Sequence, residues 1–389
     1  MKKILVFTSL FGRPFFGGAE TTVFEFYKSL AQLDSQIVIC TLDKKFANVA
    51  ESDELRNIQL KRFSTRLPHP VIERNESKFI LRLLSHFLNF SIGMRPFALL
   101  REFWSLKPNL VITHNLAGWG YLPWIIANFL RIPIIHDNHD MYLICVKTTR
   151  WKPEQGNCVR TCKQCLPRLV ATKLSWKGGV MVSNSEYLKY EIEKRITDKV
   201  RTDYEIVYPP INIAPEFDRP SQIKYDAVFV GRIEESKGIR QFLQASNGKG
   251  LVIGVGGVGE LREELEAKYP QVSFLGQVNG QNLMAQSRIL VVPSLCHETF
   301  GRVILEGIAV GIPVLVSNRG GIVEFKNRNG SQIIVINPED VADFANKIDF
   351  ALTMERNDEP INTEWLEDHY ENQLVKFKSV VSRILYASP

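Results

Sequence analysis

Two carboxylates eight positions apart are the residues whose spacing most suggests chemistry. We interpret residues 290–293 as the end of a buried strand and 294–300 as a loop that carries Glu298. A helix then begins at Gly301 and carries Glu306. A helix start presents unpaired N–H groups and a positive dipole end to an anion, and Glu306 is about two turns further along. The expected ligand therefore has an anionic middle and hydroxyl groups on both sides, as a nucleotide-sugar has.

Two more motifs follow this pair in order. The sequence reads GIPV at 311–314 and GGIVE at 320–324. Alone, Glu298 would be an ordinary loop acid and Glu306 an acid on a solvated helix face. In this company the run resembles the Glu-x7-Glu, Gly-x-Pro-Val and Gly-Gly-x-x-Glu motifs of the retaining glycosyltransferases of family 4. The resemblance implies a GT-B fold, with two doubly wound Rossmann-like α/β domains facing across a cleft, and transfer of a hexose from a nucleotide-sugar to an acceptor hydroxyl with retention of the anomeric configuration.

Two basic side chains follow the first predicted strand of the second half. Arg232 and Lys237 stand where they could clamp a diphosphate. Two isolated cations in a loop are usually just solvated, but Gly-Arg-x4-Lys-Gly resembles the phosphate-binding element of the family. The resemblance implies that both cations neutralise the charge growing on the departing diphosphate. Because the chain has no Asp-x-Asp motif, we expect catalysis to need no metal or other cofactor.

The resemblance assigns further roles around these cations. Glu298 is implied to hold the donor sugar and to steady an oxocarbenium-like centre, whereas Glu306 binds ribose hydroxyls. The other implied donor-binding residues are Gly17, Gly18, Gly276, Phe300 and Gly301. The glycine pair at 17–18 lies between a predicted strand and a predicted helix, as phosphate-cradling loops of doubly wound folds do. A lone Gly-Gly is more often a tight turn, but here it resembles the family's N-terminal loop.

A histidine-rich run follows the predicted strand at 133–135. It reads HDNHD at 136–140, at the strand end where doubly wound folds bind ligands. The run resembles the family's His-Asp pair, with His139 and Asp140 aligned to it and His136-Asp137 as the alternative. The resemblance implies that His139 contacts the transferring sugar.

Four of the six cysteines crowd into one stretch. Cys145, Cys158, Cys162 and Cys165 could supply four thiolates to a structural zinc ion, since the last two have Cys-x2-Cys spacing. Four free thiols are the alternative. A catalytic metal is not expected here, because four protein ligands would leave no open position.

Composition and charge indicate the partners. No apolar run is long enough to span a bilayer, and the apolar stretch after Lys3 is too short for a signal peptide, so we expect a cytoplasmic protein. Bases exceed acids in residues 1–205 and acids exceed bases in 206–389. The basic half favours a lipid-linked or polysaccharide-precursor glycan acceptor and peripheral contact with the anionic inner face of the cytoplasmic membrane. Apolar residues at 76–106 fit such a surface or core helices, and nothing resembles a nucleic-acid-binding motif.

The chain of 389 residues is long enough for two domains. Two prolines at 209–210 stiffen a connection there. We predict an acceptor-binding domain at 1–208 with a cysteine-rich insertion at 145–165, a domain at 209–364 that binds a UDP- or GDP-sugar, and a helix at 365–389 that crosses back. The alternatives are a GT-B sugar-nucleotide epimerase and a non-catalytic sugar-nucleotide-binding scaffold.

Overall fold

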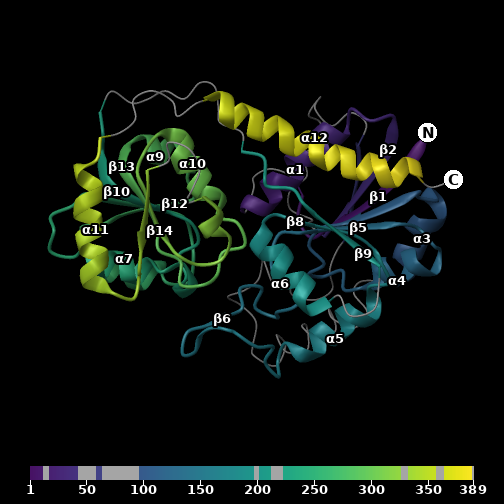
Figure 1. The fold of residues 1–389 in the computed structure, drawn as a ribbon, viewed down its shortest axis with the longest axis horizontal. Coiled ribbons are helices and arrows are strands. Elements are labelled where there is room, and N and C mark those ends of the chain that lie inside the picture. The colour runs from purple at the N-terminus through teal and green to yellow at the C-terminus, as the bar shows by residue number, and fades with distance from the viewer. Residues whose placement is uncertain are drawn as a thin grey trace. The chain divides into compact units, whose positions relative to one another are not determined.

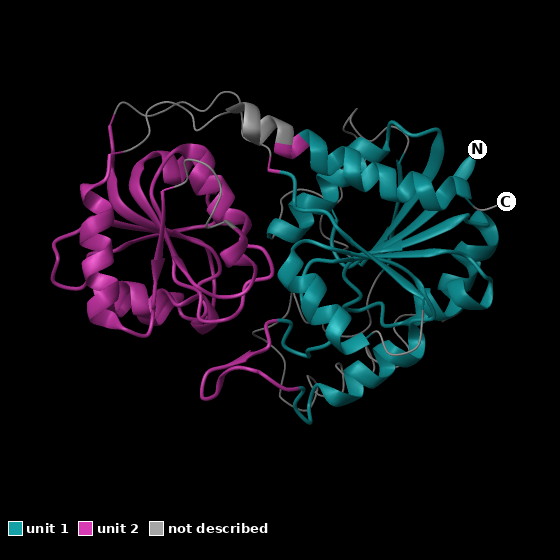
Figure 2. Ribbon diagram, viewed as in Figure 1, with its two compact units in different colours: residues 1–148, 161–210, 371–389 teal, residues 149–160, 211–370 magenta. Residues whose placement is uncertain are grey.

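The computed structural model divides the chain into two compact units (Figure 2). Unit 1 contains residues 1–148, 161–210 and 371–389, and unit 2 contains residues 149–160 and 211–370. The residues that the structure describes are 1–11, 17–42, 58–63, 96–196, 201–211, 222–325, 332–355 and 363–387.

Unit 1 is built on a seven-stranded sheet in which every neighbouring pair of strands is parallel. In spatial order the strands are β3 (Ile58–Arg62), β2 (Ser35–Thr41), β1 (Lys2–Thr8), β4 (Leu110–Thr113), β5 (Ile134–Asn138), β8 (Gly179–Ser183) and β9 (Thr202–Ile206). The central strands are continuous apolar runs because both faces of a parallel sheet are covered by helices.

The helices of unit 1 lie on both faces of this sheet (Figure 1). They are α1 (Gly18–Leu30), α3 (Pro96–Leu106), α4 (Leu122–Phe129), α5 (Leu166–Ser175), α6 (Glu186–Ile196) and the greater part of α12 (Thr363–Ala387). Phe377 of α12 stacks on Phe26 of α1 with ring centroids 4.1 Å apart. The side chain of Gln373 accepts a hydrogen bond of 2.9 Å from the N–H of Tyr208. These contacts bind the end of the chain to unit 1.

Unit 2 is built on a six-stranded sheet that is also parallel throughout. Its strands are β12 (Ser273–Gly276), β11 (Ile253–Gly256), β10 (Tyr225–Val230), β13 (Ser287–Val292), β14 (Val314–Ser317) and β15 (Ile333–Ile336). Its helices are α7 (Ile239–Ser246), α8 (Arg262–Lys268), α9 (Gly280–Ala285), α10 (Arg302–Val310) and α11 (Val341–Thr353), with short 3₁₀ turns η3 (Glu235–Lys237) and η4 (Gly321–Phe325). Two parallel sheets, each with helices on both faces, confirm the predicted pair of doubly wound domains.

The segment 149–160 differs from the expected division, because it belongs to unit 2 although the chain on both sides of it belongs to unit 1. It forms an antiparallel hairpin of β6 (Trp151–Lys152) and β7 (Gly156–Asn157). Trp151 is buried with Leu295 and Cys296 of unit 2, which is the physical reason for the assignment. The predicted cysteine-rich insertion at 145–165 is therefore shared between the units, with Cys158 in unit 2.

Helix α3 has a buried face and an exposed face. Leu99 and Phe103 are buried in the core of unit 1, whereas the side chains of Phe97 and Trp104 are 86% and 68% exposed. Of the predicted apolar segment at 76–106, the part before residue 96 lies outside the described residues. None of the described helices combines the length and apolar character that crossing a membrane requires.

Candidate functional site

Unit 2 places Lys237 against Glu298. Lys237 ends the turn η3 after β10, and Glu298 lies in the loop between β13 and α10. The Nζ atom of Lys237 is 2.6 Å from Oε1 of Glu298, and the hydroxyl of Ser294 donates to the same oxygen at 2.5 Å. Both charged side chains are more than four-fifths buried. Sequence reasoning selected both residues, but it did not indicate that they form an ion pair.

The electrostatics of this pair favour its charged state. Burial alone would lower the pKa of Lys237, but the Glu298 carboxylate outweighs burial and raises it. Burial alone would raise the pKa of Glu298, but Lys237 and the hydroxyl of Ser294 lower it below its ordinary value. The site therefore holds a fixed cation and a fixed anion side by side at neutral pH.

Backbone contacts fix the distance between the two loops. The N–H groups of Leu295 and Cys296 donate to the carbonyl oxygen of Ser236 at 2.9 and 3.1 Å. Gly238 has φ of 69°, and a Cβ at this position would lie 1.9 Å from the carbonyl oxygen of Pro293. Only glycine fits this close approach, because any side chain would collide with backbone.

Arg232 is the more exposed cation of the predicted pair. Its guanidinium donates to Oε2 of Glu234 at 2.8 Å, and its side chain is 48% exposed. The hydroxyl of Ser236 donates to the other oxygen of Glu234 at 2.5 Å. Arg232 also contributes to lowering the pKa of Glu298, so its charge acts on the same site as Lys237.

The predicted donor-binding residues around α10 are held by an ion pair, a helix cap and backbone hydrogen bonds. Glu306 pairs with Arg302, whose Nε is 2.9 Å from its Oε1, and both side chains are mostly buried. Gly301 caps the N-terminus of α10, directly after the buried Phe300. Glu298 forms a parallel bridge with Gly320, and the N–H of Gly321 donates to the Glu298 carbonyl at 2.8 Å. The Gly-Gly-x-x-Glu motif at 320–324 therefore supports the loop that carries Glu298.

The remaining predicted glycine positions are Gly276 in unit 2 and the pair Gly17 and Gly18 in unit 1. Gly276 ends β12, and its carbonyl accepts a hydrogen bond of 2.6 Å from the N–H of Gly257. In unit 1 the helix α1 begins at Gly18, and the carbonyl of Gly17 accepts from the N–H of Thr21 at 3.4 Å. Residues 12–16 of the same loop lie outside the described residues.

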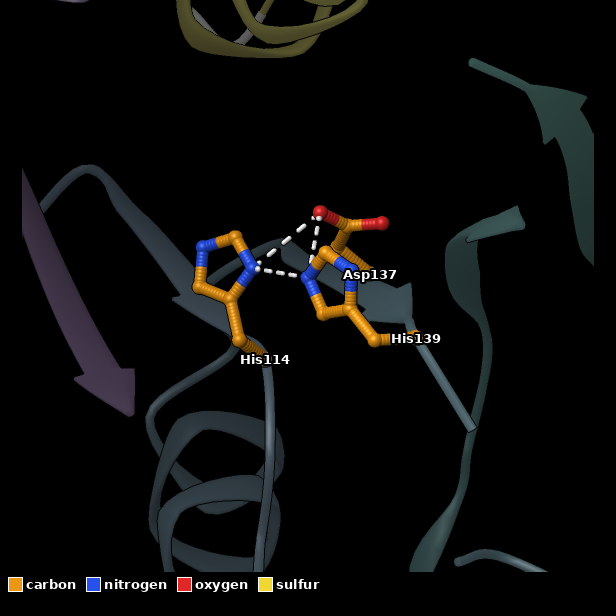
Figure 3. Close-up of side chains that lie close together, drawn as sticks. All are labelled: His114, Asp137 and His139. Atoms are coloured by element: carbon orange, nitrogen blue, oxygen red, sulfur yellow. Dashed lines mark hydrogen bonds and ion pairs between the residues drawn. The ribbon is translucent and has the colours of Figure 1, made fainter. Parts of the chain in front are cut away.

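Unit 1 brings His139 together with two side chains that were not selected as site residues (Figure 3). Oδ2 of Asp137 lies 3.1 Å from Nδ1 of His114 and 3.1 Å from Nε2 of His139, and the two ring nitrogens are 3.2 Å apart. His114 follows β4, Asp137 lies near the end of β5, and His139 follows β5. Because β4 and β5 are neighbours in the parallel sheet, their carboxyl ends present these residues at one point.

A small pocket opens beside this triad. It is lined by His114, Asn115, His136, Asn138, His139, Asp140, Tyr142 and Leu143. The hydroxyl of Tyr27 on α1 lies 2.8 Å from Nε2 of His114 and holds that ring. The alternative histidine, His136, is 2.8 Å from the hydroxyl of Thr113 through its Nδ1. Burial lowers the pKa of His136 to about 3, so it stays neutral.

The three residues of the triad titrate differently. Burial lowers the pKa of His114. Burial also opposes the charged form of His139, but Asp137 outweighs it and raises the pKa of His139. Burial opposes ionisation of Asp137 as well, and the two neighbouring imidazoles lower its pKa well below the ordinary range. Asp137 is therefore held in its anionic form.

The four predicted zinc ligands do not lie in one unit. Cys145, Cys162 and Cys165 belong to unit 1, and Cys158 belongs to unit 2. A hydrogen bond with Cys145, followed by burial, raises the pKa of the Cys165 thiol. In the described part of the chain, the cluster of three or more His, Cys, Asp or Glu residues close enough to hold a metal is the triad of unit 1. Zinc binding by the cysteines stays a prediction.

Asn157 on the hairpin is a further residue that sequence reasoning missed. Its amide nitrogen donates to the carbonyl of Leu295 at 2.9 Å, and its oxygen accepts from the N–H of His297 at 3.1 Å. Asn157 lies about 140 positions earlier in the chain and is hydrogen-bonded to the loop that carries Glu298. No local sequence signal could have indicated this contact, whereas His114 and Asp137 could have been found from their places at strand ends.

Known proteins resemble the chain in sequence and in fold. A model described as Glycosyltransferase Family 4 matches residues 16–214, and one described as Glycosyl transferases group 1 matches residues 224–354. The chain is 26% identical over 365 residues to an uncharacterized 42.6 kDa protein in the cps region of Klebsiella pneumoniae. This match covers 91% of this chain and 94% of the Klebsiella protein.

Solved structures extend the similarity over the whole length. One similar structure is sucrose-phosphate synthase from Thermosynechococcus elongatus, with a TM-score of 0.65 and 18% sequence identity. The match covers 100% of this chain and 97% of the synthase chain. Anabaena Alr3699/HepE in complex with UDP and glucose has a TM-score of 0.65 at 16% identity and covers 100% of both chains. The two family models and this shared GT-B fold lead to one conclusion: the chain belongs to glycosyltransferase family 4, among the group 1 glycosyltransferases.

Proposed function

We propose that this protein is a retaining hexosyltransferase that uses a UDP- or GDP-sugar and glycosylates a hydroxyl of a lipid-linked or polysaccharide-precursor glycan. The observation that carries the proposal is the buried pair of Lys237 and Glu298 between the end of β10 and the start of α10. It joins a cation suited to a leaving diphosphate with an acid suited to sugar hydroxyls. The UDP and glucose bound to the similar Anabaena protein support a donor of this class.

The proposed mechanism is electrostatic. Lys237 and the half-exposed Arg232 neutralise the charge that develops as the diphosphate departs, which fixed cations do without reorganising. The backbone of Phe300 and Gly301, at the start of α10, adds the positive end of the helix dipole. With these groups in place, stabilising the leaving group needs no metal ion.

The carboxylates, the histidine and the glycines are proposed to bind the donor rather than to neutralise the leaving group. Glu298 orients the hydroxyls of the donor sugar and steadies positive charge at its anomeric carbon. Glu306, held by Arg302, binds the ribose hydroxyls, and Gly276 approaches the base. His139 contacts the transferring sugar, with Gly17 and Gly18 bordering the donor and acceptor. Unit 1 then binds the acceptor.

Ligand binding tests the donor class. The purified protein is screened by thermal shift against UDP-, GDP-, ADP- and dTDP-sugars without added metal, because a ligand specific for the folded state raises the melting temperature. We expect one nucleotide series to stand out. Transfer to glycan acceptors is then followed by NMR, where the product should keep the anomeric configuration of the donor. Inversion, or epimerised donor formed without acceptor, would contradict the proposal, and no shift from any donor would favour a scaffold.

Peripheral contact with an anionic membrane is the second part of the proposal. Phe97, Arg101 and Trp104 are exposed and lie at i, i+4 and i+7 on one face of α3. Aromatic side chains and a cation on one face suit a surface of anionic headgroups. A Phe97→Ser/Trp104→Ser variant should lose co-sedimentation with phosphatidylglycerol vesicles. The matched control is Phe350→Ser on α11, which removes an aromatic side chain that is 58% exposed and should leave vesicle binding unchanged.

A further inference from the structure

We propose that His114, Asp137 and His139 bind a divalent first-row transition metal ion such as Zn²⁺. Each residue offers one ligand atom, and the three atoms form a triangle with sides of 3.1, 3.1 and 3.2 Å. Ligands about 2.0–2.1 Å from a tetrahedral zinc ion lie roughly 3.3 Å apart, so the triangle has nearly the required size before any adjustment. Figure 3 shows the two rings and the carboxylate converging on one point.

A second observation points independently to a bound cation. Oδ2 of Asp137 is buried and makes no hydrogen bond in the described part of the chain. A buried carboxylate oxygen without hydrogen bonds is costly, and such an atom calls for an explanation. The imidazole nitrogens at 3.1 Å are close enough to share a cation with it. A metal ion at the centre of the triangle would satisfy this oxygen and both nitrogens at once.

The surroundings orient the ligands as those of metal sites do. The hydroxyl of Tyr27 contacts Nε2 of His114, so the other nitrogen, Nδ1, faces the triangle. Such a partner on the far ring nitrogen is typical of metal-binding histidines. The three ligands come from the ends of two hydrogen-bonded strands, which are rigid elements. Three protein ligands leave a fourth position open, and the adjoining pocket, which His114 and His139 help to line, has room for about one water molecule.

Metal binding at this place has a consequence for the proposed transfer. The ion would occupy Nε2 of His139, so this nitrogen could not contact the sugar at the same time. The inference therefore builds on the proposed role of His139, but the binding site itself does not depend on that role. We expect added zinc to inhibit transfer and a chelator to relieve the inhibition, whereas the chelated enzyme stays active.

The test measures metal binding directly on the full chain, without substrate. The protein is stripped with a chelator, dialysed, and titrated with Co²⁺ and Zn²⁺, and its metal content is determined by mass spectrometry. We expect the triad to hold about one ion per chain with tetrahedral Co²⁺ absorption in the visible range, besides any ion that the cysteines hold. In a Cys145→Ser/Cys165→Ser variant, which lacks two of the four thiols predicted to hold zinc, this ion should remain without bands from thiolate-to-cobalt charge transfer, because its ligands are nitrogen and oxygen.

Variants separate the triad from the other candidate ligands. Asp137→Asn keeps the shape of the side chain and should abolish stoichiometric binding. A Cys145→Ser/Cys165→Ser variant and the histidine control His297→Asn should both keep the ion of the triad. Tyr27→Phe removes only the hydroxyl and should weaken binding about 10-fold, which keeps the test sound if Asp137→Asn fails to fold.

Three results would overturn the proposal: no stoichiometric ion in the wild type, an ion retained by Asp137→Asn, or an ion lost only with the cysteines. In the first case the triad is a protonated hydrogen-bonding network. None of these results bears on donor binding by unit 2, so the proposed transferase activity would stand or fall by its own test.

Discussion

The Lys237–Glu298 site of unit 2 and the histidine triad of unit 1 both lie at the carboxyl ends of parallel strands. They balance charge in different ways. In unit 2 the cluster contains a permanent cation, because Lys237 contacts Glu298 and Ser294 completes the hydrogen bonding. In unit 1 the cluster contains three groups that can all act as electron-pair donors, and its positive charge must come from a proton or a metal ion. The pair in unit 2 is therefore neutralised by its own side chains, whereas the triad in unit 1 needs a proton or a metal ion to balance the charge of Asp137.

The largest expected effect comes from removing the permanent cation. Lys237→Ala should lower turnover about 10²–10³-fold, the effect of losing one preorganised charge-stabilising group. It also leaves a buried carboxylate unpaired, which should cost about 3–5 kcal/mol of stability. Steady-state kinetics and urea denaturation measure the two effects.

Two further variants sharpen this result. Lys237→Met/Glu298→Gln should recover much of the stability but none of the activity, since it replaces both charges by neutral groups of similar size. The matched control Lys249→Ala breaks an ion pair with Asp349 on the surface of unit 2 and should leave turnover unchanged. Normal turnover in Lys237→Ala would show that unit 2 does not rely on this cation.

The next effect concerns the backbone that joins the two loops of unit 2. Gly238→Ala places a Cβ 1.9 Å from the Pro293 carbonyl and should lower stability well beyond the roughly 1–2 kcal/mol cost of a left-handed alanine. Gly248→Ala is the matched control, because Gly248 also has positive φ but no atom within 4 Å of the added Cβ. Equal melting temperatures for the two variants would disprove the role of the close approach.

A smaller effect is expected at the hairpin. Asn157→Ala removes two hydrogen bonds to the loop that carries Glu298 and should cost about 1–3 kcal/mol. Because Asn157 holds the loop without belonging to the pair, kcat should fall more than donor affinity. The exposed Asn247→Ala on unit 2 serves as control. An unchanged melting temperature and kcat in Asn157→Ala would mean that Trp151 alone anchors the hairpin.

The smallest effect is a dependence of stability on pH. The folded pKa of Glu298 lies below the ordinary value of 4.5, so the stabilisation from its ionised form is fully present above pH 4.5. It is lost as the pH falls through the folded pKa. The free energy of unfolding of the wild type, minus that of Lys237→Met/Glu298→Gln, should therefore decrease in acid. A difference that stays constant from neutral to acidic pH would rule out the lowered pKa.

Prediction from sequence was more complete for unit 2 than for unit 1. The strand, loop and helix around Glu298 are close in sequence, and their motifs identified the family and its fold, which the comparisons confirm. Lys237 and Glu298 were both selected, although 61 positions separate them, because each belongs to a local motif. In unit 1, Asp137 was passed over in favour of its neighbours, since alignment to a His-Asp pair says nothing of which side chains meet.

Patterns within short stretches of the sequence thus determined the strands, the helix starts and the residues of the donor motifs. Periodicity and turn chemistry act over only a few positions. Only the tertiary structure decided that β4 lies beside β5, which brings His114 within 3.1 Å of Asp137. It likewise decided that residues 149–160 pack on unit 2 and that Asn157 holds the Glu298 loop. These contacts depend on strand order and on the burial of Trp151, which join residues that are distant in sequence and leave no periodic pattern in it.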